Sequence, residues 1–184
     1  DYNRHVTQET FDHYCCPQCG LIFIAPIPAN LADYYPETYH FAPKSPKDLE
    51  TSSEPERYKI KIIQRFSARG RLLEIGPSHG SFTYLAKKAG YEVEAIEMNA
   101  RCCQFLHEVV GVNAINSNNP IEVLRQAEPY DVIALWHVIE HLPNPWPTLD
   151  AICASLKPGG IVVLAAPNPD AFQFRIMGCY WPHV

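Results

Sequence analysis

Two features that would indicate common classes of binding partner are missing from this chain. It has no long run of basic residues, and its 184 residues carry a net charge of -5. Its longest apolar runs, residues 21–26 and 161–167, are far shorter than the roughly 20 residues that a membrane-spanning helix needs. The sequence therefore predicts neither a nucleic-acid partner nor a membrane span, and it does not indicate an oligomeric state.

Cysteine is also not arranged as a secreted disulfide framework would require. There are seven cysteines, an odd number, in a chain with 47% apolar and 19% charged residues. That composition suits a globular protein with a substantial core rather than a small disulfide-stapled scaffold. We expect a reducing, cytoplasmic location.

The most informative stretch is RLLEIGPSHGSFTYLAKKAG, residues 71–90. It begins as a short apolar strand, turns between Gly76 and Gly80, and continues at helical spacing up to Gly90. Glycine lets the backbone turn sharply and leaves room for a ligand, and the start of the helix suits an anionic group. Glu74 lies at the carboxyl end of the strand, where open α/β sheets bind ligands. The stretch predicts a ligand-binding strand–turn–helix; the alternative is an ordinary turn without a ligand.

This turn resembles motif I of the class I S-adenosylmethionine (SAM) methyltransferases, in which an acidic residue precedes Gly-x-Gly-x-Gly. Here the motif is EIGPSHG, so Ser78 replaces the middle glycine. The resemblance implies that SAM is the cofactor and that residues of this turn hold its methionine end, namely Glu74, Gly76, Pro77, Ser78 and Gly80. A dinucleotide is disfavoured, because the spacing is not G-x-G-x-x-G and an acidic residue would face a pyrophosphate.

A second predicted strand, residues 91–97, ends in Glu97, about twenty residues beyond the glycine turn. An acidic side chain at that place can accept hydrogen bonds from both ribose hydroxyls of an adenosine. Met98 follows, and a thioether packs well against an aromatic ring such as adenine. We therefore predict that Glu97 and Met98 bind the cofactor; the alternative for Glu97 is a surface charge or the cap of the next helix.

Residues 130–136, YDVIALW, form a predicted strand that is apolar enough to be buried on both faces. With the segment HVIEHLPNP that follows, they resemble motif IV of a small-molecule methyltransferase subgroup similar to the enzymes of ubiquinone and menaquinone biosynthesis. Trp136 and His137 are predicted to line the cofactor cleft. Because histidine titrates near neutral pH, His137 and His141 are the candidate catalytic bases; the alternative is that Glu140 and His141 only brace their loop.

Predicted strands and helices alternate along most of the chain. The strands are expected at residues 72–75, 91–97, 112–116, 130–136 and 161–166. Alternation of this kind, with right-handed crossovers, gives a doubly wound, mostly parallel Rossmann-like α/β sheet.

The segments around this core carry further expectations. A polar linker is predicted at residues 42–54, followed by a helix that begins near Pro55 and is capped by Ser53 or Glu54. The sequence KPGG at residues 157–160 is predicted to form a turn before the last strand. The resemblance implies two more strands after the fifth, and only residues 169–184 remain, so the domain is expected to be C-terminally incomplete.

The amino-terminal quarter differs in composition, being rich in proline, tyrosine and histidine. Its sequence CPQCG, residues 16–20, is the turn with which zinc ribbons aim two thiolates at a metal. Cys16 and Cys19 are therefore candidate ligands of a structural zinc ion. Such a site needs four ligands, and only one such turn is present. Half of a ribbon, a site completed by other residues, and no metal at all remain open.

We expect two parts: a partial zinc-ribbon-like leader and linker at residues 1–50, and a SAM-dependent methyltransferase domain at residues 51–184. The leader resembles one found ahead of some SAM methyltransferases, which makes Tyr34, Tyr35 and Tyr39 candidates for a lid over the cofactor; the alternative is that they only pack the leader. The predicted function is methyl transfer to a small-molecule acceptor. The alternatives are a SAM-binding sensor without turnover and a zinc-ribbon interaction module on a degenerate domain.

Overall fold

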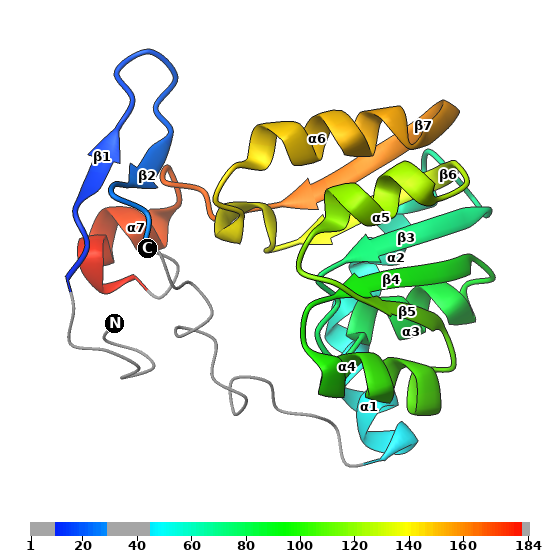
Figure 1. The fold of residues 1–184 in the computed structure, drawn as a ribbon. Helices are drawn as coiled ribbons and strands as arrows, with labels where there is room; N and C mark the ends of the chain where they lie inside the picture. The colour runs from blue at the N-terminus through cyan, green and yellow to red at the C-terminus, as the bar shows by residue number, and fades with distance from the viewer. Residues whose placement is uncertain (1–9, 29–44, 182–184) are drawn as a thin grey trace. The chain divides into compact units, whose positions relative to one another are not determined.

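The computed structural model describes residues 10–28 and 45–181 (Figure 1). The chain forms two compact units, one built from Asp1–Tyr39 with Pro167–Val184 and the other from His40–Ala166. The predicted boundary between residues 50 and 51 remains a prediction. None of the helices in the described ranges combines the length and the apolarity that crossing a membrane requires.

The larger unit is organised around a five-stranded sheet in which all neighbouring strands are parallel. The strands are β3 (Arg71–Ile75), β4 (Glu92–Glu97), β5 (Asn113–Asn116), β6 (Tyr130–Trp136) and β7 (Leu156–Ala165). Their order in the sheet is β5-β4-β3-β6-β7. The chain therefore extends the sheet from β3 to one side and then resumes on the other side of β3. The predicted α/β sheet is confirmed, and ligands of such sheets bind at the carboxyl edge where this reversal occurs.

Helices cover both faces of the sheet (Figure 1). Packed on one face are α1 (Pro46–Ser53), α2 (Arg57–Ile63), α3 (Ser81–Lys88) and α4 (Ala100–Phe105), the last continuing into a π-helical turn, η4 (Leu106–Val110). Packed on the other are α5 (Pro120–Gln126) and α6 (Pro145–Ala154). Successive strand residues alternate between the two cores: Leu72 and Val132 point to the first, Leu73 and Ile133 to the second. All four are fully buried, as the apolar strand sequences predict.

The predicted linker at residues 42–54 is wrong over most of its length, because Pro46–Ser53 is the helix α1. The hydroxyl oxygen of Ser45 accepts a hydrogen bond from the backbone N–H of Asp48 (3.2 Å), and Pro46 occupies the first helical turn. Both are favourable at a helix start. Leu49 is fully buried and anchors this helix to the core. A 3-10 turn, η3 (Glu54–Glu56), separates α1 from α2, so the helix expected from Pro55 begins at Arg57.

The predicted turn at residues 157–160 is also wrong, because these residues belong to β7. The pairing of β7 with β6 is irregular there, with a register shift between Tyr130 and Val132. Gly159 has φ of +79°, which accommodates this irregularity within the strand.

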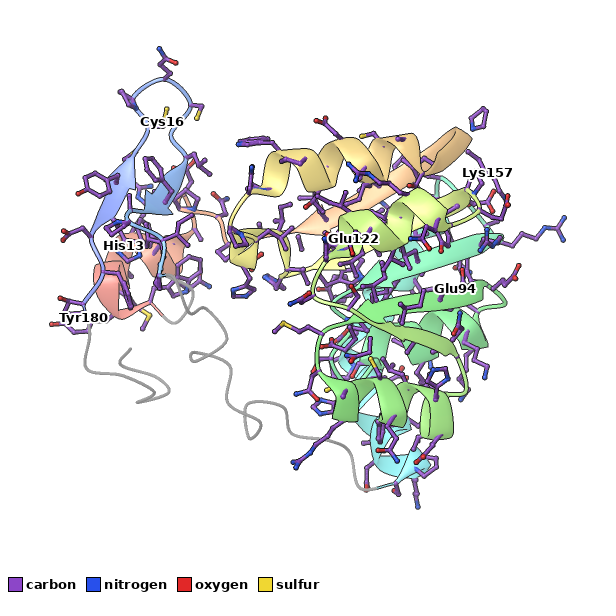
Figure 2. All side chains as sticks on the ribbon, in the orientation of Figure 1. His13, Cys16, Glu94, Glu122, Lys157 and Tyr180 are labelled. Carbon is purple, nitrogen blue, oxygen red and sulfur yellow. The ribbon has the colours of Figure 1, made fainter. Side chains whose placement is uncertain are left out.

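The smaller unit contains an antiparallel hairpin of β1 (His13–Cys15) and β2 (Ile22–Ile24). Figure 2 shows Cys16 in the loop that joins these strands. The loop is closed by two backbone hydrogen bonds of 2.9 Å, from Cys16 N–H to the carbonyl of Leu21 and from Gly20 N–H to the carbonyl of Cys16. The CPQCG turn therefore lies between β1 and β2. After β7, the chain forms α7 (Phe172–Met177) and a 3-10 turn, η6 (Gly178–Tyr180).

Gly80 and Gly90 provide a matched test of packing at the turn after β3. Both have left-handed φ, +75° and +93°. A Cβ on Gly80 would lie 2.4 Å from Cδ2 of the fully buried Leu106, whereas a Cβ on Gly90 would meet nothing within 4 Å. We predict that Gly90→Ala lowers the free energy of unfolding by about 1 kcal/mol, from backbone strain. Gly80→Ala should cost about 1–3 kcal/mol more, from overpacking.

Urea unfolding of the two variants and the natural chain measures this difference. Equal losses at the two positions would show that the turn after β3 does not pack on η4 as described.

Candidate functional site

The carboxyl ends of three adjacent strands bring the predicted site residues together. The turn at residues 76–80 follows β3. Glu97 ends β4 and Met98 follows it, and Trp136 ends β6 and His137 follows it. Since β3 lies between β4 and β6, these segments meet at one edge of the sheet. The backbone N–H of Ser78 donates a hydrogen bond to Oε2 of Glu97 (2.9 Å), which joins the turn directly to the end of β4.

The turn after β3 contains three left-handed residues. Gly76, Ser78 and Gly80 have φ of +69°, +54° and +75°. These are the three positions that motif I fills with glycine, so Ser78 adopts the glycine-like conformation despite its Cβ. Such a conformation costs on the order of 1–3 kcal/mol and tends to occur at functional sites. A Cβ on Gly76 would lie 2.6 Å from Cγ2 of Val138, so this glycine is needed for packing between the two loops.

Glu97 is 4% exposed, and both oxygens of its carboxylate already accept backbone hydrogen bonds. Oε2 accepts from Ser78, and Oε1 accepts from the N–H of Asn99 at 2.8 Å. A carboxylate offers about four acceptor positions, so these two hydrogen bonds do not use the full acceptor capacity of Glu97. Asn99 itself caps α4, which removes the alternative that Glu97 is the helix cap.

The loop after β5 braces this part of the site. Nδ2 of Asn116 donates to the backbone carbonyls of Glu97 (3.0 Å) and Met98 (2.9 Å). Met98 is 53% exposed, so its side chain is accessible to a planar ligand. Sequence analysis did not predict this bracing role of Asn116.

Glu74 lies in the core rather than at the surface and is 3% exposed. The hydroxyl of Thr83 on α3 donates a hydrogen bond to Oε2 of Glu74. Burial raises the pKa of Glu74 to about 8, although the Thr83 hydrogen bond and the charge of Lys59 both act to lower it. At neutral pH the Glu74 side chain is therefore largely protonated.

Lys59 on α2 lies against the predicted site residue Trp136, a contact that sequence analysis did not predict. It is 8% exposed, and its Nζ donates to Oε2 of Glu56 at 2.9 Å. The same Nζ lies 4.7 Å from the centre of the Trp136 ring, an attractive cation–π arrangement. A charged residue on the buried side of an amphipathic helix, next to Ile60 and Ile63, was the signal that could have identified it.

The surroundings of Trp136 indicate whether the residues at this edge of the sheet could bind SAM. Its ring packs edge-on against Phe82, with 5.3 Å between ring centres. Its Nε1 is buried and has no hydrogen-bond partner in the part of the chain that the structure describes. A buried N–H without an acceptor costs about 1–3 kcal/mol. This donor and the Lys59 ammonium suit the carboxylate of SAM, and Glu74 suits its ammonium, so the residues present fit the cofactor.

The two candidate bases differ in how they are held. His137 has φ of +57°, its N–H donates to the carbonyl of Ala165 (2.9 Å), and its side chain is 53% exposed. Its Nδ1 lies 3.4 Å from Oε1 of Glu140. His141 ends the 3-10 turn η5 (Ile139–His141), one turn farther along the chain. The structure thus places His137, in a strained conformation, at the end of β6 itself.

Comparison with known proteins identifies the family. A family model described as a methyltransferase domain matches residues 52–183, well over half of the chain. The chain belongs to the methyltransferase-domain family. The class I, SAM-dependent type predicted from motif I agrees with this match and with the relatives and solved structures below.

The methyltransferase domain has named relatives in bacteria. It is 31% identical over 115 residues to a ubiquinone biosynthesis O-methyltransferase of Bordetella avium, covering 59% of this chain and 48% of that protein. It is 32% identical over 117 residues to one of Cereibacter sphaeroides, covering 60% and 47%. The chain spans about half the length of the curated relatives it matches.

Solved structures resemble the methyltransferase domain in fold. A SAM-dependent methyltransferase from Archaeoglobus fulgidus superposes with a TM-score of 0.56 at 26% identity, covering 67% of this chain and 57% of that one. The glycopeptide N-methyltransferase MtfA in complex with SAM has a TM-score of 0.51 at 14% identity, covering 60% and 54%. The second likeness is one of fold alone.

The expectations for the leader are less well supported. Backbone N–H groups of Cys19 and Gln18 lower the pKa of the Cys16 thiol, as in a metal-binding turn. However, within residues 10–28 and 45–181 no group of three or more His, Cys, Asp or Glu side chains could hold a metal ion. Zinc on Cys16 and Cys19 therefore remains a prediction. The lid candidates Tyr34, Tyr35 and Tyr39 lie outside the described residues.

A cavity of about 540 Å³ lies beside α5, and its lining includes Asn116, which braces the end of β4. Its lining includes Arg71, Glu94 and Tyr130 but no residue of the turn after β3. Within it, Oε2 of Glu94 accepts hydrogen bonds from Arg71 (2.7 Å) and Tyr130 (2.9 Å). These polar side chains hydrogen-bond to one another, so we do not assign a ligand to this cavity. The functional assignment rests on the residues at the carboxyl ends of the strands.

Buried Glu74 makes a prediction about stability. A raised pKa in the folded state means that stability falls as pH rises from the ordinary glutamate pKa toward about 8. Glu74→Gln removes this loss while keeping an acceptor for Thr83. The variant should therefore be more stable than the natural chain at pH 8, by on the order of a few kcal/mol. The gain should shrink at pH 5, and urea unfolding at both pH values measures it.

Glu94→Gln is the matched control, and its expected effect on stability at pH 8 is opposite to that of Glu74→Gln. Burial raises the pKa of Glu94, but hydrogen bonds from Asn113 and Tyr130, with the charge of Arg71, outweigh burial and hold this pKa below its usual range. Glu94→Gln should thus destabilise the protein at pH 8, and this loss should shrink only in acid. A Glu74→Gln variant less stable than the natural chain at pH 8 would contradict the account of Glu74.

Proposed function

We propose that this chain is part of an enzyme that transfers a methyl group from SAM to a small-molecule acceptor. The observation that carries the proposal is the hydrogen bond from the motif I turn to the buried carboxylate of Glu97, at the edge of a methyltransferase-family sheet. It joins the two segments that the motif assigns to the two ends of one cofactor. The relatives are O-methyltransferases of ubiquinone biosynthesis, which favours an acceptor oxygen on a small molecule.

Different residues bind different parts of the cofactor. The turn after β3, together with Glu74, Lys59 and Trp136, holds the amino-acid end. Glu97 accepts hydrogen bonds from the ribose hydroxyls, and Met98 packs against the adenine. When bound, SAM supplies a methyl group on a positively charged sulfur, ready for in-line displacement.

His137 is the proposed base for an acceptor hydroxyl. Its place at the end of β6 holds an imidazole at the same edge as the cofactor residues, and imidazole can accept a proton near neutral pH. His141 is the second candidate, from the following turn. An imidazole nitrogen of either residue would accept the proton of the acceptor hydroxyl group.

The proposal has two further elements, a structural zinc ion and a cytoplasmic location. A structural zinc ion on Cys16 and Cys19 is supported by the closed turn and the lowered thiol pKa, and needs ligands beyond the two cysteines. A cytoplasmic location is supported by the odd number of cysteines. A SAM-binding sensor without turnover is the alternative function, because it needs the same cofactor residues and no base.

Cofactor binding to Glu97 tests the proposal. Calorimetric titration with SAM and with its demethylated product, S-adenosylhomocysteine, should show micromolar binding to the natural chain. Glu97→Ala should weaken that binding at least tenfold, about 1.4 kcal/mol or more, because two ribose hydroxyls lose their acceptor. Glu92→Ala, at the exposed start of the same strand, is the control and should change the affinity less than twofold.

Because Glu97 also braces the turn, thermal unfolding must show that Glu97→Ala is folded. If the folded natural chain binds neither compound, the methyltransferase proposal fails for this chain. Equal affinities for the two variants would remove Glu97 from the site.

A further inference from the structure

The surroundings of Glu74 are unusual for an ionisable group. The residue lies inside β3, where its register partners on β4 and β6 are Ala95 and Ala134, both fully buried. The side chain points to the same core as Phe82 and Leu85 on α3. Among the ion pairs of the described residues, none includes Glu74. A buried carboxylate without a paired cation is strongly disfavoured against the neutral carboxylic acid.

The charged groups that face Glu74 do not compensate this burial. The Lys59 ammonium on α2 favours the ionised form of Glu74. However, its Nζ donates a hydrogen bond to Glu56 and lies over the Trp136 ring. Glu56 itself, and Glu97 from β4, add negative charge that disfavours it. From α3, Thr83 contributes only a neutral hydroxyl. Burial outweighs these effects and sets the pKa of Glu74 at about 8.

Cofactor binding changes this balance, because the amino-acid end of SAM carries an ammonium group. Glu74 lies at the start of the turn assigned to that end. A cation within hydrogen-bond reach lowers the pKa of a carboxyl group by about 1–3 units, and a buried ammonium itself requires an anionic partner. The ionised form of Glu74 then becomes the favoured one.

We infer that Glu74 is protonated in the cofactor-free protein and releases its proton to solvent as the ammonium of the cofactor binds. The O–H bond of Glu74 breaks, the proton passes to the buffer, and the carboxylate pairs with the ammonium. Cofactor affinity therefore rises with pH between about pH 6 and 8. This inference rests on the proposed function.

Calorimetry in several buffers measures the released proton. S-adenosylhomocysteine is titrated into the natural chain at pH 6.5, where a free α-amino group is still charged, in buffers of low and high ionisation enthalpy. The slope of the observed enthalpy against that ionisation enthalpy counts the protons exchanged. We expect at least half a proton released per ligand bound. Methylthioadenosine, which has the adenosine but no ammonium, should bind with a slope near zero.

Variants assign the proton to one residue. Glu74→Gln should bind S-adenosylhomocysteine more weakly and with a slope near zero, measured at ligand concentrations up to millimolar. Glu92→Gln, an exposed carboxylate exchanged in the same way, should keep the slope of the natural chain.

The outcomes separate the inference from the proposed function. Tight binding with no proton released, or equal release by the Glu74→Gln variant, would overturn the inference and leave SAM binding intact. Failure of the natural chain to bind S-adenosylhomocysteine would overturn both.

Discussion

The hydrogen bonds accepted by the buried carboxylate of Glu97 are the interactions on which the rest of the predicted site depends. The carboxylate accepts one hydrogen bond from the turn that leaves β3 and another from the loop that leaves β4. These loops follow different strands, and nothing in the pairing of β3 with β4 by itself fixes how they lie beyond the sheet. A buried acceptor that serves both loops fixes them relative to each other. The same carboxylate retains free acceptor positions for hydroxyl groups of a ligand.

Several costs to folding are concentrated at this edge of the sheet. Ser78 and His137 have left-handed backbones, Glu74 is a buried carboxyl group, and the indole N–H of Trp136 has no described partner. Each is unfavourable in the folded protein by about 1–3 kcal/mol or more. Such unfavourable features are expected to cluster at a site that binds a charged ligand, and they are not expected to cluster where residues only pack together. A ligand with both an ammonium and a carboxylate would satisfy Glu74 and Trp136 together.

The sheet could be predicted from the sequence because its strands are short apolar runs separated by clear helical segments. The edge of the sheet could be predicted because the glycine turn of motif I follows one strand directly, and Glu97 and Trp136 each end another. The helix α1 was missed because its proline and serines suggest a linker, although Ser45 and Asp48 form a helix cap. Lys59 and Thr83 were missed for a different reason: their contacts join a helix to a strand that is distant in the sequence, to Trp136 on β6 and to Glu74 on β3. The position of Lys59 on the buried side of α2 was a local signal, but it does not identify the partner.

The central claim is that the cofactor binds at the carboxyl ends of β3, β4 and β6. The most direct measurement is a two-dimensional ¹H–¹⁵N NMR titration of the chain with S-adenosylhomocysteine, which reports on each backbone N–H separately. The account predicts that the largest changes fall on residues 74–80, 97–99 and 136–138, with Ser78 among them. Changes concentrated instead around the cavity beside α5, with residues 74–80 unaffected, would contradict it.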